Sequence, residues 1–533
     1  MNVIGLSKTR TAVRAFVLAA VVALAAAGCG TGTQQQSTGD WRTDADRGAI
    51  LRAGARLTPA WVSKTFDPLK SIGGSDIVLD RLIYGTLTGK NAAGQPTPWL
   101  VESWSQPEPT VLDLKVRQGV TFHDGSPFTA EAVKAGLDRN RSAGSPYAAS
   151  LAAISSIELP DANTVRLVTS RPASGALLLT LSGREGLIPG PASLADPDSM
   201  ATNPIGAGPF QILEWRQGES MKLRAYPGYY DKDQYLVAGI DFVNVNDEVS
   251  ARNAVLAGDI DVGFVDAEGV PALTANPGTA VAVNQSDAAY YVNINLTTQN
   301  PPLADVRVRQ AINTAVNRDQ IASAVIGAGS APAWQLFPQG YPGHDPALEK
   351  RYAYDPARAR QMLADAGYPN GFDMKLYAVS TTPSITRTTE IVAANLNDVG
   401  IRTQIVAGTS WVQDYAIDRK GDAAVGTWLP RTDPTLTFQS LFGGVGTLNV
   451  GKYSSPELNG IVDQAQGVTD SAAADTLLKQ ASGYVVDQAL EVPIAYMPSL
   501  WGYSQKIGLR DGTLRDHGNL GQGLDFTSVY VKR

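Results

Sequence analysis

Cysteine and histidine are scarce in this 533-residue chain, which has one cysteine and three histidines. A single cysteine excludes an intrachain disulfide and a cluster of thiolate metal ligands. The histidines, at positions 123, 344 and 517, are too scattered to bind a bare metal ion together, and we expect no cofactor. The chain also lacks the P-loop, H-E-x-x-H, G-x-S-x-G and S-x-x-K motifs, so the sequence gives no support to nucleotide hydrolysis, zinc proteolysis or serine catalysis.

Runs of basic residues are also absent beyond the N-terminal segment, and the formal net charge is −7 with a sequence pI of about 5.2. This balance argues against nucleic-acid binding and favours small solutes or other proteins as partners. With 44% hydrophobic residues, the chain is long enough to form two or three lobes, each with its own core.

The N-terminal segment has the composition of a secretion signal. Three positive residues precede an apolar stretch, Ala15 to Ala27, that is too short to be a convincing membrane span. The small residues before Cys29 resemble a bacterial lipoprotein signal, although Ala26 stands where such signals usually carry leucine. We expect residues 1–28 to be removed, Cys29 to be lipidated and residues 29–45 to form a flexible tether to the outer face of the cell membrane. The alternative is an ordinary secretory signal with an incidental cysteine.

The segment after residue 111 predicts a strand, a turn and a helix. Apolar and polar residues alternate from Leu112 to Phe122, as in a half-buried strand, and Asp124-Gly125 supplies a turn. Thr129 can cap the helix that follows. His123 and Asp124 have the composition of a catalytic dyad, but beside a turn we interpret them as structural residues.

Residues 117–133 (RQGVTFHDGSPFTAEAV), with Glu102-Ser103-Trp104 ahead of them, resemble the signature of the extracytoplasmic solute-binding proteins of family 5. These are the peptide and nickel receptors of ABC importers. Thirteen consecutive residues follow the family pattern, and the sequence departs from it mainly at Ala132. Residues 203–210, 257–262 and 302–312 resemble further family patterns, so the resemblance covers nearly the whole mature chain. It implies a two-lobed α/β fold of the periplasmic-binding-protein type (type II, cluster C).

The resemblance also implies a division of the chain. Lobe I is expected to comprise residues 46–85, 200–283 and 502–533, and an extra scaffold subdomain residues 86–199. Lobe II is expected to comprise residues 284–501. Two chain crossings, the first near Val281 to Asn295, would form a hinge between the lobes.

Periodicity predicts the main elements. One helix is expected to end near Tyr84, another is expected to start at Ala130, and three more are expected to span roughly 356–366, 384–399 and 472–488. Strands are expected to span 51–57, 401–406 and 423–428. Gly206 and Gly208 are expected to adopt positive φ in a tight turn. A phosphate loop is the alternative, but no Gly-Lys-Ser/Thr follows.

The resemblance places the ligand site between residues 411 and 449. In peptide-binding members a tryptophan opens a short helix, and the next strand ends in a motif resembling G-W-x-x-D, followed by D-P. The first of these aspartates pairs with the amino terminus of the peptide. Trp411 matches the helix tryptophan, and Gly426-Thr427-Trp428 matches the strand end. Arg431 stands where the amine-binding aspartate is expected, and Asp433 matches the later acid.

This departure from the family pattern leaves two alternatives. In the first, Arg431 binds a ligand carboxylate or phosphate, because a guanidinium makes strong bidentate bonds to such groups. In the second, a one-residue shift of the loop lets Asp433 bind the amine, while Arg431 faces solvent or pairs with that aspartate.

Four further residues complete the predicted site. Arg419 lies near the position where some relatives keep an arginine for peptide carboxylates, and Asn449 and Tyr453 lie in a segment that resembles the family's N-x-x-x-Y. Trp501 would add an apolar wall to those of the two tryptophans named above. The alternatives are an exposed helix position for Arg419, and core packing for Tyr453 and the tryptophans.

Together the residues and the resemblance predict a lipid-anchored receptor that captures oligopeptides or dipeptides between its lobes and delivers them to an ABC permease, without catalysis. The resemblance implies a monomer. The main alternative ligands are a non-peptide anion, a haem-like group or metal complex, and an oligosaccharide conjugate. A surface adhesin on the same fold is another alternative. A hydrolase that pairs Asp433 with Asp261 or Asp266 is the most remote.

Overall fold

The computed structural model describes residues 41–59, 62–71, 76–91, 95–172, 175–296, 300–327, 329–380, 382–428, 433–444, 446, 448–468, 470–515 and 523–533. It divides into Met1–Thr43 and a body from Asp44 to Arg533, and the body is the subject below. The expected signal peptide and most of the expected tether lie outside the described residues. Within the tether range, Trp41–Asp44 forms the short helix α2. The names lobe I, scaffold subdomain and lobe II are kept for the residue ranges given above.

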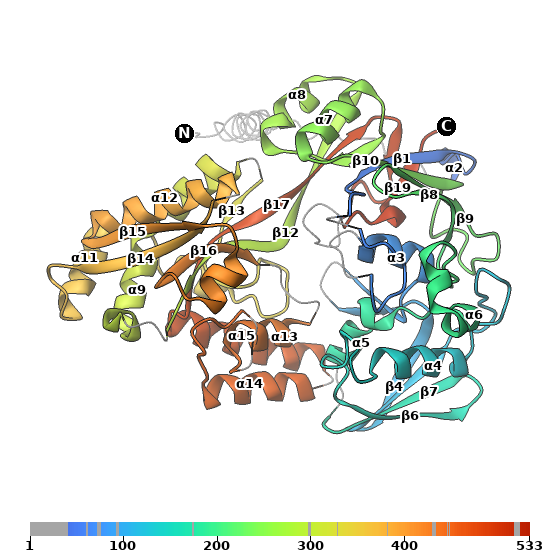
Figure 1. The fold of residues 1–533 in the computed structure, drawn as a ribbon, viewed down its shortest axis with the longest axis horizontal. Coiled ribbons are helices and arrows are strands. Elements are labelled where there is room, and N and C mark those ends of the chain that lie inside the picture. The colour runs from blue at the N-terminus through green and yellow to red at the C-terminus, as the bar shows by residue number, and fades with distance from the viewer. Residues whose placement is uncertain are drawn as a thin grey trace, which may run out of the picture. The chain divides into compact units, whose positions relative to one another are not determined.

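One long sheet runs through the body (Figure 1). Within the described residues it has eleven strands in the order β15-β14-β16-β12-β17-β11-β1-β10-β9-β8, with β13 paired to β17. Their bounds are β1 Ile50–Ala55, β8 Phe210–Arg216, β9 Ser220–Ala225, β10 Gly239–Asn244, β11 Val262–Phe264, β12 Thr279–Ile294, β13 Ala331–Pro332, β14 Phe372–Val379, β15 Ile401–Gly408, β16 Ala423–Trp428 and β17 Glu491–Ser504. The predicted strands over 51–57, 401–406 and 423–428 are confirmed.

Strands β12 and β17 connect the two halves of this sheet. They pair antiparallel from Thr279 opposite Ser504 to Asn293 opposite Glu491, with a shift in register between Gln285 and Ala289. One end of the pair joins β16 and the other joins β11. The chain therefore crosses between the halves twice, on adjacent strands.

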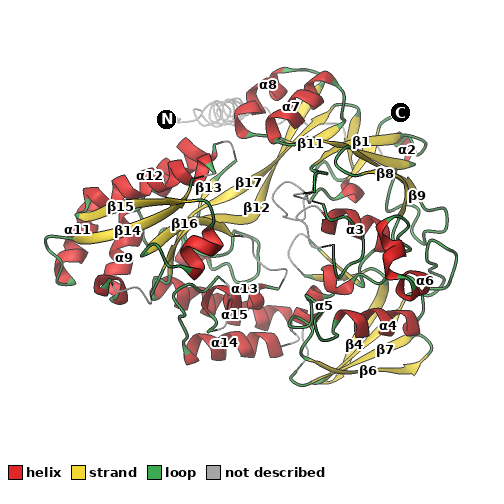
Figure 2. Cartoon of the chain, viewed as in Figure 1, coloured by secondary structure: helices red, strands yellow, loops and turns green. Residues whose placement is uncertain are grey.

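Helices cover both faces of the sheet in lobe II (Figure 2). Residues alternate along β12, so that Tyr290 and Val292 pack in the core under α9, α11 and α12, while Tyr291 packs in the core under α13, α14 and α15. Asp355 caps α11 by accepting a hydrogen bond from the Arg358 N–H. The bounds are α9 Val306–Ala315, α11 Pro356–Asp365, α12 Pro383–Asp398, α13 Pro434–Phe442, α14 Pro456–Gly467 and α15 Ser471–Asp487.

The scaffold subdomain contains its own four-stranded sheet, ordered β4-β5-β7-β6. Helix α4 packs on it through Val133 and Leu137, and Thr129 caps the helix by accepting from the Ala132 N–H, as predicted. The predicted strand ends earlier than expected, at Val116. The buried Phe122 instead lies in a loop that contains an isolated bridge between residues 121 and 127. The bounds are α4 Ala130–Asn140, α5 Gly175–Thr180, β4 Val101–Glu108, β5 Val111–Val116, β6 Ile154–Asp161 and β7 Thr164–Thr169.

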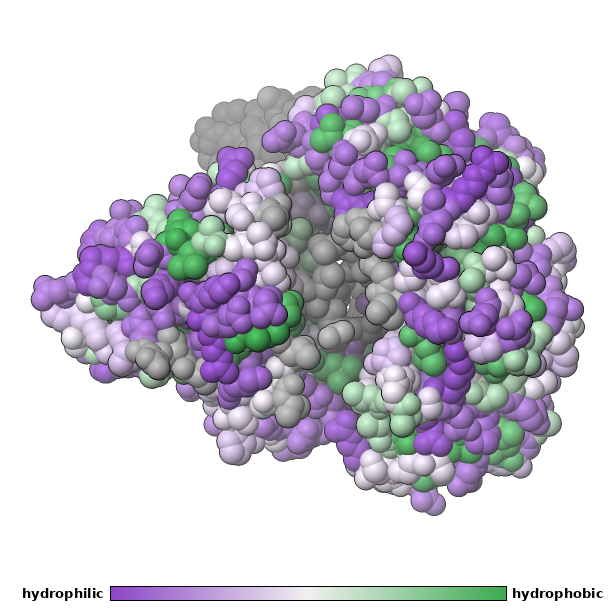
Figure 3. Space-filling model, viewed as in Figure 1, coloured by the Kyte–Doolittle hydropathy of each residue, from purple (hydrophilic) through white to green (hydrophobic). Residues whose placement is uncertain are grey.

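The remaining elements are short. They are α3 Asp76–Tyr84, α6 Pro191–Ala195, α7 Glu248–Ala257, α8 Val270–Ala275, α10 Arg318–Ile321, β2 Thr88–Lys90, β3 Pro96–Pro98, β18 Ile507–Leu509 and β19 Val529–Val531. Figure 3 shows hydrophilic residues over most of the viewed face, with hydrophobic residues in small patches. The large apolar side chains lie mainly in the cores of lobe I, lobe II and the scaffold subdomain.

His123 and Asp124 are structural, as interpreted from the sequence. The Nε2 of His123 lies 3.0 Å from the Gly208 carbonyl, and its Nδ1 accepts a hydrogen bond from the Gly206 N–H at 3.4 Å. Burial lowers the pKa of His123 to about 4, so the ring is neutral near pH 7. Asp124 accepts hydrogen bonds from Ser126 within the turn. The histidine therefore fastens the scaffold subdomain to lobe I.

The expected role of the glycines at 206 and 208 is wrong. Neither is among the glycines with positive φ. A Cβ at Gly206 would lie 2.2 Å from the Ile83 carbonyl oxygen, and one at Gly208 would lie 2.5 Å from the Leu82 carbonyl oxygen. Glycine is required there because the backbone passes directly against the end of α3.

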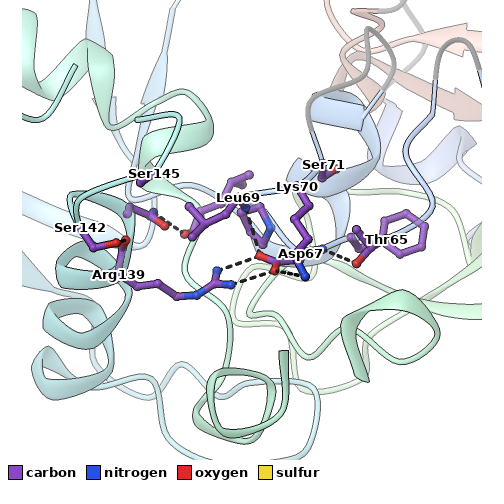
Figure 4. A network of polar contacts seen from close by, with 12 residues as sticks. Thr65, Asp67, Leu69, Lys70, Ser71, Arg139, Ser142 and Ser145 are labelled. Carbon is purple, nitrogen blue, oxygen red and sulfur yellow. Dashed lines mark hydrogen bonds and ion pairs between the residues drawn. The ribbon is translucent and has the colours of Figure 1, made fainter. Parts of the chain in front are cut away.

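A buried ion pair also joins lobe I to the scaffold subdomain (Figure 4). Arg139, near the end of α4, contacts both carboxylate oxygens of Asp67 at 2.8 Å. Asp67 is fully buried, and it also accepts a hydrogen bond from the Leu69 N–H. Lys70 reaches the same carboxylate at 4.0 Å. The pair fixes the segment after β1 against the scaffold helix.

Candidate functional site

Trp428 ends strand β16 on the face toward α13, α14 and α15. It is 4% exposed, and its ring packs edge-on against Phe337 at a centroid distance of 6.3 Å. Phe438 of α13 also packs edge-on against Phe337, at a centroid distance of 5.6 Å. Trp428 therefore supports the start of α13 from within the core of lobe II, and its contact with a ligand stays a prediction.

Asp433 stands at the start of α13 and is 4% exposed. Its Oδ1 accepts hydrogen bonds from the Thr435 N–H and from the Thr435 hydroxyl, both at 2.8 Å. Burial raises the pKa of Asp433, and the two bonds from Thr435 and the charge of Arg171 oppose that rise. Among the described residues, none donates a hydrogen bond to Oδ2. One oxygen thus caps the helix, and the other remains available.

Gln466 of α14 extends this arrangement. Its Nε2 donates to the Thr435 Oγ1 at 3.0 Å, and Thr435 in turn donates to Asp433. The Gln466 Oε1 is buried and accepts no hydrogen bond within the part of the chain that the structure describes. Within the described residues, the Gln466 Oε1 is therefore a buried acceptor without a donor, in the same network as Asp433. The sequence gives no sign of Gln466, because it depends on how α13 and α14 pack.

A cavity of about 270 Å³ lies beside Asp433. One wall comes from lobe II, and the other from the scaffold subdomain. The lobe II wall includes Asp433, Thr435, Ala465, Val468, Asp475 and Leu478, and the scaffold wall includes Trp104, Leu112, Leu178 and Leu179. The cavity is thus mainly apolar, with a buried carboxylate in its wall.

Trp411 opens a short π-helix, η7 Trp411–Ile417, as the sequence predicts for a helix at this position. Its ring packs edge-on against Tyr415 at 5.2 Å. A Cβ at Gly426 would lie 3.1 Å from the Trp411 Nε1, so a glycine there lets the indole rest on β16. The Nε1 is buried without a hydrogen-bond acceptor among the described residues.

Three other predicted site residues occupy different surroundings. Arg419 follows η7 in an exposed turn with a φ of 54°. Asn449 is buried and bonds the carbonyls of Gly443 and Tyr453 and the Tyr453 N–H, so its side chain holds its own loop together. Tyr453 donates to or accepts from the Tyr484 hydroxyl at 2.8 Å. Burial raises the pKa of Tyr453 to about 12.

Trp501 lies on β17, at the end of the strand that pairs with β11. It is 3% exposed, its Nε1 donates to the Ser499 hydroxyl, and its ring packs edge-on against Phe264. A small cavity of about 40 Å³ is lined by Trp501, Phe264 and Phe526. The structure thus places Trp501 away from the cavity beside Asp433.

Two predicted residues, Arg431 and Cys29, lie outside the described residues. The acids considered for a hydrolase are engaged elsewhere: Asp261 forms an ion pair with Arg52, and Asp266 forms one with Arg252. Within the described ranges, no three Asp, Glu, His or Cys side chains are placed to hold a metal ion together. None of the described helices is both long enough and apolar enough to cross a membrane.

The sequence does not identify two buried ionisable residues of lobe II, Arg318 and Glu491. Arg318 is 1% exposed and donates to main-chain carbonyls that include those of Ala333 and Pro493. Its guanidinium lies over the ring of Trp334, 4.8 Å from the centroid. Glu491, at the start of β17, is 3% exposed, and both its carboxylate oxygens lack a hydrogen-bond partner among the described residues. Glu491 interrupts an apolar segment, whereas Arg318 stands among polar residues, and only the packing reveals that both are buried.

Comparison with known proteins places these features in context. The model of the bacterial extracellular solute-binding proteins, family 5 Middle, matches residues 95–449, which is more than half of the chain. The glutathione-binding protein GsiB of Escherichia coli (strain K12) is 24% identical over 489 residues, covering 87% of this chain and 91% of that protein.

Solved structures share the fold. The periplasmic binding protein DppA from Helicobacter pylori, in complex with the peptide STSA, aligns with a TM-score of 0.71 and 22% identity over 92% of this chain and 99% of that chain. NikA from Staphylococcus aureus, in complex with Ni(L-His)2, aligns with a TM-score of 0.69 and 20% identity over 91% of this chain and 100% of that chain.

Proposed function

This chain belongs to the family 5 bacterial extracellular solute-binding proteins, the non-enzymatic binding components of ABC importers, and from this premise we propose that it captures short peptides. The observation that carries the proposal is the buried carboxylate of Asp433, whose Oδ2 has no hydrogen bond from a described residue. A peptide ammonium is a positively charged hydrogen-bond donor, and such an oxygen can accept a hydrogen bond from it. The glutathione-binding relative and the neighbour in complex with STSA also support a peptide.

The capture mechanism follows from the fold. The ligand binds against lobe II, the paired strands β12 and β17 bend, and the closed form excludes water from the ligand. Binding requires no covalent chemistry. We propose that the closed form, acting as a monomer, is then recognised by the transmembrane subunits of the permease.

A second candidate is a non-peptide anionic or chelate ligand. It is favoured by Arg431, which stands where peptide-binding members carry the amine-binding aspartate. A guanidinium pairs with carboxylate or phosphate and repels an ammonium. The neighbour in complex with Ni(L-His)2 is an example of a chelate bound on this fold.

Mass spectrometry of small molecules released from the purified protein would separate these candidates. A tight ligand is expected to survive purification, because it stabilises the bound form by about 3 kcal/mol at a hundredfold excess over its dissociation constant. A set of short peptides would support the proposal, and a single non-peptide anion would contradict it. If peptides bind, Asp433→Asn should abolish ligand-induced thermal stabilisation and Arg431→Ala should matter less. The reverse ranking would favour the anion.

We also propose that Cys29 carries a lipid that holds the protein on the outer face of the membrane. The support is the signal-like segment that ends at Gly28. Replacing Cys29 with serine is expected to move the protein from the membrane fraction to the soluble fraction without changing ligand binding. Retention of the variant on membranes to the same extent as the parent would refute the lipid anchor.

A further inference from the structure

We propose that the cavity at the junction of the scaffold subdomain and lobe II binds an ammonium group that is joined to a compact apolar group. The ammonium would bind the Oδ2 of Asp433, and the apolar group would lie between Leu178 and Leu478. Free aliphatic amines and the apolar first residue of a peptide share this chemistry. The inference goes beyond peptide capture, because it gives the scaffold subdomain half of a binding site.

The geometry supplies the first argument. Residues of helix α5 in the scaffold subdomain and of α13 in lobe II line the same cavity of about 270 Å³. Leu112, Leu178 and Leu179 face it from the scaffold, and Ala465 and Leu478 face it from lobe II. Apolar surface on both sides favours an apolar occupant, because burying that surface removes it from water.

The unsatisfied acceptors supply the second argument. Asp433 is only 4% exposed. Its Oδ1 caps α13, so hydrogen bonds from the described residues compensate the carboxylate charge at one oxygen only. Gln466 adds a buried Oε1 without a hydrogen-bond donor among the described residues. A buried carboxylate that is partly unpaired is costly, and a cationic donor would offset that cost. The Oδ2 of Asp433, which lines the cavity, selects for an ammonium and against a carboxylate.

The charge of the lining supplies the third argument. Asp433 and Asp475 are the charged residues that line the cavity within the described ranges, and both are acidic. Asp475 is already engaged, since it accepts a hydrogen bond from the Gly343 N–H and pairs with Lys479 at 2.6 Å. Asp433 is therefore the acid that remains for a ligand cation.

Titration calorimetry on the purified full-length protein can test this proposal. The probes are isopentylamine, which is an ammonium near pH 7, and isopentanol, which has the same carbon skeleton and no charge. We expect the amine to bind more tightly than the alcohol. Asp433→Asn should weaken the amine by roughly tenfold or more, the loss expected for one charge-assisted hydrogen bond, and leave the alcohol unchanged. Asparagine is also a good helix cap, so this variant should fold.

Two further variants serve as controls. Leu178→Phe should weaken both probes, because the larger ring occupies the cavity. Asp355 caps α11 as Asp433 caps α13, but it does not line the cavity. Asp355→Asn should therefore change the affinity for neither probe. Equal binding of amine and alcohol, no binding of the amine, or amine binding that survives Asp433→Asn would overturn the proposal.

Peptide probes distinguish the two sources of the ligand. Binding of leucyl-glycyl-glycine that is lost on acetylation of its amino group would assign the site to the first residue of a peptide, and this arm rests on the proposed function. Binding of isopentylamine without binding of the tripeptide would assign it to a free amine. If mass spectrometry returns a non-peptide anion while isopentylamine still binds at Asp433, the peptide function fails and the cavity assignment stands.

Discussion

Replacing Arg139 with alanine is expected to lower the free energy of unfolding by about 3 to 5 kcal/mol, because it leaves a buried carboxylate without its partner. Asp67 is fully buried, whereas the Arg139 side chain is 21% exposed, so the aspartate bears most of the cost of the broken pair. Lys70 at 4.0 Å can compensate only in part. Urea-induced unfolding near pH 7 measures the loss.

Arg141 offers a matched control at the end of the same helix. It pairs with Asp138, and both side chains are partly exposed, so Arg141→Ala should cost about 1 kcal/mol or less. If Arg139→Ala and Arg141→Ala lower the free energy of unfolding equally, the buried pair of Asp67 and Arg139 does not have the expected role in stability. The double variant of Asp67 and Arg139 to alanine should be less destabilised than the sum of the single variants, because the two residues act as one pair.

Replacing Glu491 with glutamine is expected to stabilise the protein by about 3 kcal/mol near pH 7. Burial raises the pKa of Glu491 from 4.5 to about 8, and neither carboxylate oxygen has a hydrogen-bond partner among the described residues. Glu491 lines a small cavity together with Asn313, Gln335 and Tyr352. The folded protein near pH 7 therefore holds Glu491 protonated, whereas the unfolded chain releases the proton.

The sign of the pH dependence follows from this difference. Between pH 4.5 and about 8 the unfolded state binds fewer protons than the folded state at this residue, so the contribution of Glu491 to stability falls as the pH rises. The fall is about 1.4 kcal/mol per pH unit. Glutamine, which does not titrate, should remove this slope, so that the variant and the parent are nearly equal at pH 4 and diverge toward pH 8.

Unfolding midpoints in urea across this pH range would test the prediction. Glu390→Gln, on the exposed side of α12, is the control and should leave the slope unchanged. If the slope of the Glu491→Gln variant matches that of the parent, Glu491 is ionised in the folded protein and the predicted gain disappears.

The sequence predicts well what depends on neighbours along the chain. Apolar spacing predicts the strand over residues 423–428, and apolar spacing with capping residues predicts the helices that start at Ala130 and Pro356, because these signals act over a few neighbouring residues. The family resemblance added the order of these elements. His123 could also be interpreted correctly, since an adjacent Asp-Gly indicates a turn.

What the sequence could not give depends on contacts between distant segments. Gly206 is required by a carbonyl more than a hundred residues away in the chain, at Ile83, and a local pattern cannot show this. The burial of Glu491 depends on the packing of elements far from β17 in sequence. The cavity beside Asp433 needs the scaffold and lobe II together, so the motif located the aspartate but not its apolar neighbours.

The two ends of the body meet at one place. Ala45 forms a bridge with Lys532, and the Arg533 N–H donates to the Asp44 carbonyl. Lobe II lies between these two ends in the sequence, and the chain enters it along β12 and leaves it along β17. If the N-terminal segment is held at a membrane, lobe I stays fixed relative to the membrane and lobe II moves. A permease would then detect ligand capture as a displacement of lobe II relative to lobe I. Within the described chain, β12 and β17 are the only covalent links that transmit this displacement.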